Sequence, residues 1–266
     1  MKRKCAVFTI VKNEKYFLPI WLKHYKKYFE NKDILILDHM STDGSTSGLD
    51  VESIKVHNPN GEDEVFDTSW LLHTVKYFQA KLFEHYQSVL FTEVDELVYS
   101  LKIPLNKTID NFLKSDSRFA TCTGYEIVQN LKKEHALKSN EFVKERNYWI
   151  RAYAYNKTLL SKVPLDWKGG FHQIRSEEVD NSFDLFLCHL HRMDLNLMLK
   201  RNVERIKNFT ISKNVGPTPN QLMNENDIKH NFIYVQHRGG INSQDVLETI
   251  PANHKAALSC KFKRIY

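Results

Sequence analysis

Val89-Leu90-Phe91-Thr92-Glu93-Val94-Asp95-Glu96-Leu97-Val98 is an apolar run that three acids interrupt. A strand that buries Val89 to Phe91 and then presents Glu93 and Asp95 two residues apart places both carboxylates on one face. Mg²⁺ and Mn²⁺ prefer oxygen ligands and often share them with substrate phosphates. The stretch therefore predicts a divalent metal site at the end of a strand, with solvated acids as the alternative.

The composition favours a folded protein without a membrane span. Of the 266 residues, 42% are hydrophobic and 12% aromatic, enough for a substantial core. The net charge of +6 is mild, and it fits an anionic small-molecule substrate or a peripheral association with an acidic membrane surface as well as it fits nucleic acid. No apolar run approaches the ~18 residues of a transmembrane segment. The four cysteines lack any C-x-x-C spacing, so we expect reduced thiols and a cytoplasmic protein.

The first hundred residues alternate between buried strands and amphipathic helices. We expect strands at 5–11, 34–38, 53–56 and 89–95, and helices from about 17 to 28 and from 69 to 86. This order indicates a parallel α/β sheet with right-handed crossovers. Ligands bind such sheets at the carboxyl ends of the strands. The polar residues expected at those ends are Asn13, Asp38, Asp43, Glu93 and Asp95.

The second half has a different pattern. It predicts strands at 119–127, 148–155, 184–191 and 232–235, a helix at 194–209, an exposed excursion at 128–147 and a loop at 167–172. The strand at 184–191 would place His189 and His191 on one face. No independent linker is apparent, so we expect one domain at 1–210 with an extension, 211–266, packed on it.

The acids after the second predicted strand suit a nucleotide. Asp38 and Asp43 can accept hydrogen bonds from a base or a ribose, although both residue types also form turns and cap helices. Asn13 and Glu14, after the first strand, are equally compatible with a simple loop.

Three segments resemble family-2-like and family-92-like glycosyltransferases. They are Phe8 to Glu14 with Leu18 to Tyr25, Ile36 to Ser45, and Phe91 to Glu96, which is similar to the D-x-D-E metal motif. Weaker similarity continues through 155–157, 167–172 and 189–200. The resemblance implies a GT-A (Rossmann-like) fold with a mixed, mainly parallel sheet, a nucleotide-binding half at 1–98 and an acceptor half at 99–210. Glu93 replaces the first Asp of the motif, so Asp95 is the stronger candidate ligand.

The same resemblance implies the chemistry. We expect a UDP- or GDP-sugar donor, a carbohydrate or glycoconjugate acceptor, and Mn²⁺ or Mg²⁺ bound through Asp95 and Glu93. By position in the family, His191, with His189 on the same face, is a candidate metal ligand, and Glu178 or Glu177 is the candidate base of an inverting transfer. Glu126 and His172 compete with these acids as the base. Lys157 and Arg192 are candidates for contact with the diphosphate, with a surface charge as the alternative for each.

Two other functions fit the sequence less well. A nucleotidyltransferase of related fold would carry a glycine-rich basic loop after the first strand, where Lys12-Asn13-Glu14 stands. A non-catalytic module for nucleic acid or anionic glycan would cluster its basic residues, whereas here charges of both signs are dispersed. We therefore expect no nucleic-acid partner.

Overall fold

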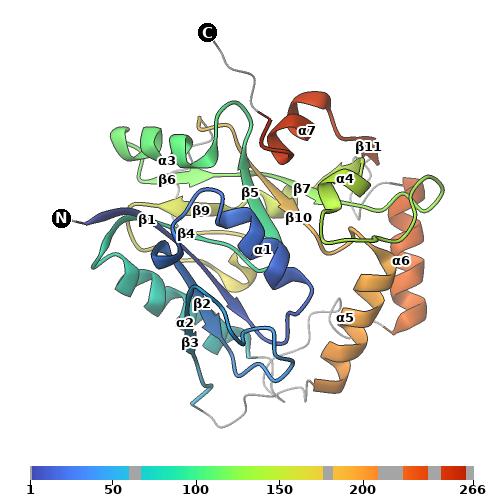
Figure 1. Cartoon of the computed structure of the whole chain (residues 1–266), viewed down its shortest axis with the longest axis horizontal. Coiled ribbons are helices and arrows are strands. Elements are labelled where there is room, and N and C mark those ends of the chain that lie inside the picture. The colour runs from blue at the N-terminus through green and yellow to red at the C-terminus, as the bar shows by residue number, and fades with distance from the viewer. Residues whose placement is uncertain (1, 60–66, 176–181, 209–223, 239–246, 262–266) are drawn as a thin grey trace.

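The computed structural model describes residues 2–59, 67–175, 182–208, 224–238 and 247–261. Its described strands form two mixed sheets (Figure 1). The first sheet has six strands in the order β3-β2-β1-β4-β9-β6. Its members are β1 Arg3–Val11, β2 Ile34–Asp38, β3 Glu52–Lys55, β4 Tyr86–Phe91, β6 Phe119–Thr121 and β9 Thr158–Ser161.

The parallel part of this sheet confirms the predicted first half. β1 pairs in parallel with both β2 and β4, and β2 pairs in parallel with β3. Val7 and Leu35 to Leu37 are almost completely buried, as expected for strands covered on both faces. Val11 is in register with Asp38, and Asp38 with Lys55, so the loops that follow these strands leave from one edge.

Helix α1, Phe17–Tyr25, holds the acidic stretch in place. Trp21 donates a hydrogen bond from Nε1 to Thr92 Oγ1 at 2.8 Å, and the backbone N–H of Val98 donates to Tyr25 Oη at 3.0 Å. Both aromatic residues are fully buried. The aromatic face of the predicted first helix therefore fixes the backbone on either side of the acids.

The expected strand at 89–95 is wrong beyond Phe91. β4 ends there, residues 92–95 form a turn closed by the Glu96 N–H donating to the Glu93 carbonyl at 3.0 Å, and a new strand, β5 Glu96–Ser100, begins. β5 belongs to the second sheet. Glu93 and Asp95 consequently do not share one strand face, because the chain changes sheets between them.

The second sheet has the order β11-β8-β7-β10-β5. Its further members are β7 Thr123–Ile127, β8 Tyr148–Arg151, β10 Leu185–His189 and β11 Glu248–Thr249. His189 is in register with Glu96 on one side and with Glu126 on the other. Cross-strand partners share a face, so these three side chains form a row across the sheet.

Several predictions for the second half need correction. The expected strand at 119–127 is split between the two sheets, and the one at 148–155 ends at Arg151, before the 3₁₀ turn Tyr153–Tyr155. His191 lies beyond the end of β10. Residues 232–235 are helical, within α6 Glu225–Arg238, because Ile228 and Phe232 have helical spacing and pack with Met198 of α5.

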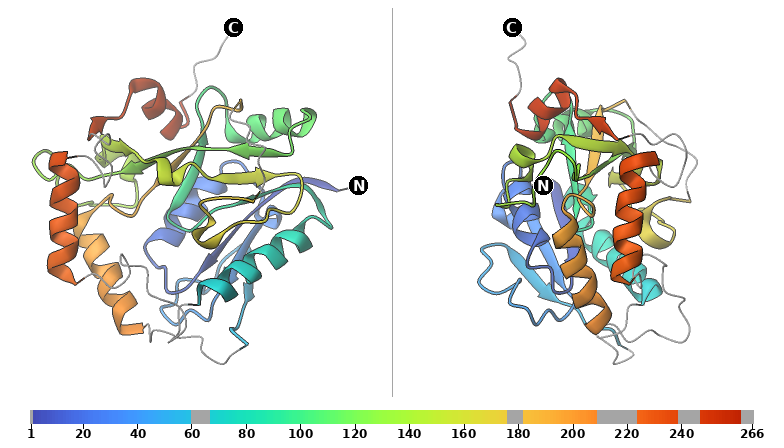
Figure 2. Two further views of the ribbon diagram at one scale, coloured as in Figure 1. Left: turned by 180° about the vertical axis from the view of Figure 1, so that it is seen from behind. Right: turned by 90° about the vertical axis from the view of Figure 1, so that its right-hand side faces the viewer.

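The helices cover the sheets from several sides. α5 and α6 lie side by side at one flank of the molecule, and α7 lies against β5 (Figure 1 and Figure 2). The expected helix at 194–209 is α5 Leu195–Asn208. The other α-helices of the described residues are α2 Thr68–Leu82, α3 Leu105–Lys114, α4 Phe142–Glu145 and α7 Ala252–Leu258. The fold is thus a mixed, Rossmann-like α/β arrangement with two sheets where the sequence predicts one.

One hydrophobic core joins both sheets. Phe91 links them to the loop at 167–172, since its ring lies 5.3 Å from that of Trp167 and 4.7 Å from that of Phe171. All four cysteines are free thiols. None of the helices in the described ranges combines the length and apolar character that crossing a bilayer requires.

Candidate active site at the carboxyl edge of the six-stranded sheet

The loops after β1 and β2 are tied together by the predicted polar residues. Asn13, in the left-handed region with φ 55°, accepts hydrogen bonds through Oδ1 from the backbone N–H groups of Thr42 (2.8 Å) and Asp43 (3.3 Å). Asp43 Oδ2 accepts from the Lys15 N–H at 3.1 Å. Asp38 is buried and accepts from Ser41 N–H at 2.7 Å and from Thr46 Oγ1 at 2.7 Å. These residues shape the edge, and their contact with a nucleotide stays a prediction.

A buried guanidinium joins the loop after β1 to the acidic turn. Arg201 of α5 donates from Nη2 to Glu14 Oε1 at 2.6 Å and from Nε to the same oxygen at 3.1 Å. Its Nη1 donates to Asp95 Oδ2. Arg205, one helical turn later, lies 3.5 Å from Glu14 Oε1. We call Glu14, Asp95, Arg201 and Arg205 the outer cluster.

The charges of the outer cluster hold Asp95 ionised. Burial alone would raise the pKa of Asp95, but Arg201, His189 and Arg205 outweigh it and keep that pKa well below its ordinary range. The pKa of Arg205 is lowered by burial and by the neighbouring Arg201 guanidinium. The cluster therefore contains two cations that repel each other and two acids that hold them together.

A second group of charges lies on the inner side of the same turn. Lys157 is completely buried, and its Nζ contacts Glu93 Oε2 at 2.6 Å and Glu96 Oε1 at 2.5 Å. Burial raises the pKa of Glu96 to about 7, because the attraction of Lys157 only partly offsets it and the Glu93 carboxylate adds to it. We call Glu93, Glu96 and Lys157 the inner cluster. The Lys157 ammonium is enclosed by these two acids. Its predicted contact with a diphosphate stays a prediction.

His189 connects the two clusters to Glu126. Its Nδ1 lies 3.0 Å from Glu126 Oε1, and its Nε2 lies 3.7 Å from Asp95 Oδ2. Arg192 is ion-paired with Glu126. Burial would raise the pKa of Glu126, but Arg192 and the His189 hydrogen bond lower it to about 2. Glu126 at neutral pH is therefore a bound counter-ion, which makes it a poor acceptor for a proton.

The fit of a divalent cation rests on Asp95 and His189. In the described ranges no group of three His, Cys, Asp or Glu side chains is arranged to hold a metal ion. Asp95 and His189 do face each other, and Glu126 orients the histidine in the way that outer-shell carboxylates orient metal-binding imidazoles. Mg²⁺ is commonly held by one or two carboxylates, with substrate phosphates completing the shell. Asp95, beside His189, fits such a partial site. Glu93 is ion-paired with Lys157, and its predicted contact with the metal stays a prediction.

His172 lies beside this row of side chains. Its ring is 5.8 Å from that of Tyr155, which in turn stacks on His189 at 4.0 Å. His172 Nδ1 is 2.7 Å from the Ala154 carbonyl, so Nδ1 carries the proton and Nε2 keeps a lone pair. Partial burial and Lys157 lower the pKa of His172. Gly170 leaves the space for this ring, since its φ is 73° and a Cβ would lie 2.9 Å from His172 Cδ2.

Arg201 and Arg205 are not among the residues predicted from the sequence. Their i, i+4 spacing on a predicted helix was the available signal, because it puts both guanidiniums on one face. Two of the predicted bases, Glu177 and Glu178, lie outside the described residues. His191 follows β10, and its ring lies 5.8 Å from that of His189, so its predicted place at the metal stays a prediction.

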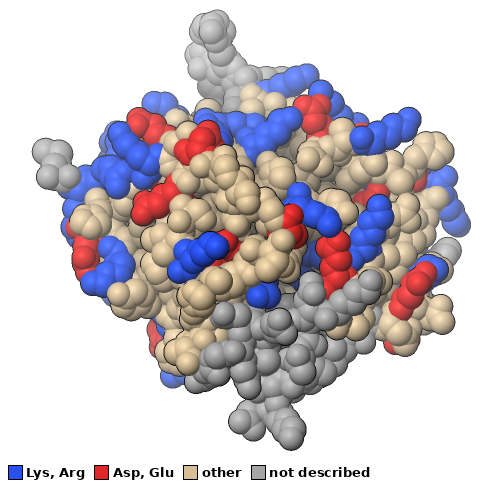
Figure 3. All heavy atoms as spheres, turned by 60° about the horizontal axis from the view of Figure 1, so that its bottom comes forward, with Lys and Arg blue, Asp and Glu red and all other residues tan. Residues whose placement is uncertain are grey.

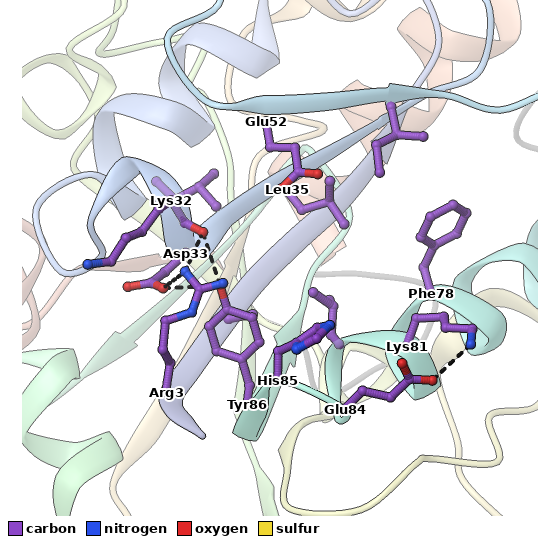
Figure 4. A pocket seen from close by; sticks show the side chains of 14 residues that line it. Arg3, Lys32, Asp33, Leu35, Glu52, Phe78, Lys81, Glu84, His85 and Tyr86 are labelled. Atoms are coloured by element: carbon purple, nitrogen blue, oxygen red, sulfur yellow. Dashed lines mark hydrogen bonds and ion pairs between the residues drawn. The ribbon is translucent and has the colours of Figure 1, made fainter. Parts of the chain in front are cut away.

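A cavity of about 210 Å³ lies at the opposite edge, where β1, β2 and β4 begin (Figure 4). Four of its charged side chains are already paired, Arg3 with Asp33 at 2.8 Å and Lys81 with Glu84 at 2.8 Å. Sites for small molecules are typically about 300–1,000 Å³, so this cavity is small for one. We place the candidate site at the carboxyl edge because polar and charged side chains from several strand ends meet there. On the face in Figure 3, basic and acidic side chains are interspersed without a continuous basic patch.

Comparisons with known proteins found similarity in solved structures only. No family model and no curated protein sequence matches the chain. The mannosyltransferase Ktr4p of S. cerevisiae matches at 15% identity and a TM-score of 0.30, over 48% of this chain and 40% of its own. The mannosyltransferase PcManGT of Pyrobaculum calidifontis, solved with GDP-Man and Mn²⁺, matches at 13% identity and a TM-score of 0.34, over 89% of this chain and 70% of its own.

Proposed function

We propose that the chain is a metal-dependent glycosyltransferase that moves a sugar from a nucleotide-diphosphate sugar to an acceptor hydroxyl, with inversion at the anomeric carbon. The observation that carries the proposal is the meeting of Glu14, after β1, and Asp95, after β4, at one strand edge beside two arginines and His189. Cations that face a strand edge suit the phosphates of a nucleotide. The resemblance of the three sequence segments to glycosyltransferases supports the same activity.

In this proposal Asp95 and His189 would hold Mn²⁺ or Mg²⁺, which would supply positive charge to stabilise the diphosphate as it leaves. Glu126 keeps the His189 ring oriented. Lys157 forms ion pairs with Glu93 and Glu96 and thereby fixes the turn on which Asp95 lies. The interlocked loops around Asn13 and Asp38 receive the nucleoside.

His172 is the acceptor base that the described geometry supports best. Its lowered pKa keeps it neutral at pH 7, and Nε2 can accept a proton. The acceptor oxygen forms a bond to the anomeric carbon, its proton passes to His172 Nε2, and the bond between that carbon and the diphosphate breaks. Attack opposite the leaving group produces inversion.

Incubation with a panel of UDP- and GDP-sugars and Mn²⁺ tests the activity, with release of the nucleoside diphosphate as the readout. We expect turnover with at least one donor and none with Asp95→Ala. His172→Gln should lower kcat by about 10²–10⁴-fold and leave donor affinity unchanged.

Lys168→Gln is the matched control for these variants, since Lys168 is exposed and near His172 in sequence. Full turnover by Asp95→Ala, with its fold verified by circular dichroism, would refute the metal role. Full turnover by His172→Gln would instead remove His172 as the base.

A further inference from the structure

The arginines of α5 are placed as a pair. Arg201 and Arg205 are one helical turn apart and both reach Glu14 Oε1. The Arg201 side chain is 6% exposed and the Arg205 side chain 28%, so the pair runs from the interior to the rim. The Arg201 guanidinium also lies over the ring of Phe17, 4.4 Å from its centroid, which holds its plane in a fixed direction. A second link, Lys15 to Glu204 at 2.9 Å, fastens the same helix to the loop after β1.

The Glu14 carboxylate lies between these two cations. A single oxygen, Oε1, receives hydrogen bonds from three guanidinium nitrogens, two of Arg201 and one of Arg205. Two guanidiniums this close together repel unless an anion lies between them. A phosphate offers more acceptor oxygens and more charge than one carboxylate oxygen, and it matches the planar guanidinium fork.

We propose that Arg201 and Arg205 form a phosphate-binding subsite for the diphosphate of a nucleoside diphosphate, in which Glu14 is the internal anion that the ligand displaces. The inference rests on the proposed function for the identity of the ligand. It adds that the chain binds a nucleoside diphosphate through these arginines without a divalent cation, and that Glu14 competes with the ligand.

The position of Arg201 and Arg205 indicates where the nucleoside part of the ligand would lie. Glu14 directly follows Asn13, whose amide holds the loop after β2, so a phosphate beside Glu14 leaves the rest of the ligand along these interlocked loops. The loops provide polar groups from both strand ends. Inorganic pyrophosphate would satisfy only the arginines and should bind more weakly than UDP or GDP.

Isothermal titration of UDP, GDP and pyrophosphate in EDTA tests the subsite without any turnover. Arg205→Gln is the main variant because its partly exposed side chain can be replaced with the fold intact. We expect about a tenfold weaker Kd for it, the loss of one charge-assisted contact. Arg201→Lys, which keeps the charge and loses the fork, should also weaken binding. Glu14→Gln should tighten it.

Lys200→Gln is the control, since Lys200 is an exposed cation on the same helix. An unchanged Kd for both arginine variants, or weaker binding by Glu14→Gln with its fold intact, overturns the subsite. Binding that needs Mn²⁺ and Asp95 but neither arginine overturns the subsite and leaves the proposed function standing. Arginine-dependent binding in EDTA without transfer from any donor supports the subsite and counts against glycosyl transfer. Absence of nucleotide binding with and without Mn²⁺ overturns both.

Discussion

The inner and outer clusters lie on two sides of one turn, and they differ in how their buried charges are paired and in which charged group is exposed. In the inner cluster a single ammonium, Lys157, is enclosed by Glu93 and Glu96 and has no exposed surface. In the outer cluster two guanidiniums share Glu14 and Asp95, and the Arg205 side chain remains 28% exposed. In the inner cluster the cation is enclosed and the exposed group is an acid, Glu93, with 39% of its side chain exposed, whereas in the outer cluster the most exposed group is a cation, Arg205, which can take a new anion.

This difference separates a supporting role from a binding role. A fully buried ion pair contributes little net stability compared with an apolar replacement, but breaking it is costly because one charge is left alone. An arginine at the rim, such as Arg205, can change partners at small cost, because water reaches its side chain. We therefore assign the geometry of the acidic turn to the inner cluster and the ligand chemistry to the outer cluster.

Removing the inner cation should have the largest effect on stability. Lys157→Met leaves Glu93 and Glu96 without their counter-ion, and we expect the free energy of unfolding to fall by about 3–5 kcal/mol. Urea denaturation followed by circular dichroism measures it. Lys168→Met, an exposed lysine, should change it by no more than about 0.5 kcal/mol. Equal effects of the two substitutions would contradict the supporting role.

Removing the Asp95 carboxylate of the outer cluster should lower the unfolding free energy less than removing Lys157 does, and it should weaken metal binding. Asp95→Asn leaves Arg201 bound to Glu14, so we expect a loss of about 1–3 kcal/mol in unfolding free energy. The extra rise in Tm that Mn²⁺ produces beyond the rise with a nucleoside diphosphate alone should disappear. Differential scanning fluorimetry measures both quantities, and a Mn²⁺-dependent extra rise that survives in this variant would exclude Asp95 as a metal ligand.

The two clusters should respond to pH in opposite directions. The pKa of Glu96 is raised to about 7, so the folded state gains a proton and stability falls as pH rises from 4.5 through 7. This slope is limited to about 1.4 kcal/mol per pH unit. The depressed pKa of Asp95 gives stability that is present above pH 3.8 and is lost only below it.

Urea midpoints between pH 5 and pH 7.5 distinguish these contributions. Glu96→Gln should remove the fall that Glu96 contributes over this range, so its slope should be more positive than that of the wild type, and Asp95→Asn should leave the slope unchanged. The comparison of slopes is needed because His24 and His191, whose pKa values are lowered by burial, contribute stability that rises with pH. Equal slopes for the wild type and Glu96→Gln would show that Glu96 is ionised throughout.

The smallest effect on stability is expected at the rim. Arg205→Gln removes a cation that lies 3.5 Å from Glu14 and is partly solvated, so the unfolding free energy should change by less than about 1 kcal/mol. Thermal denaturation measures it. A loss as large as that of Lys157→Met would show that the outer cluster is as closed as the inner one.

The parallel strands and their common edge could be predicted because burial leaves a local signal. Apolar runs such as 34–38 identify strands regardless of their neighbours, and the polar residues after them follow by position. The prediction that Glu93 and Asp95 share a strand face was wrong for a tertiary reason. Both acids continue an apolar run, and nothing local records that the chain leaves one sheet and enters another at Thr92 to Asp95.

The arginines and the second sheet depend on contacts between distant segments. Arg201 matters because α5 lies against the loop after β1, which a helix pattern does not specify. The wrong strand at 232–235 has a similar origin. Phe232 to Val235 is a short run with β-forming residues, and only the contact of Phe232 with Met198 shows that a helical face is buried there.

The outer cluster also bears on the order in which the chain folds. The contact of Arg201 with Glu14 spans 187 residues and that with Asp95 spans 106, so each closes a very long loop. Contacts of this kind form late and slow the folding of a domain. During synthesis from the N-terminus, both acids leave the ribosome well before α5 exists. Docking of that helix is then the step that first dehydrates the strand edge. A nascent chain that ends before α5 would contain the strands of the first sheet and β5, β7, β8 and β10 of the second, with two open, hydrated carboxylates.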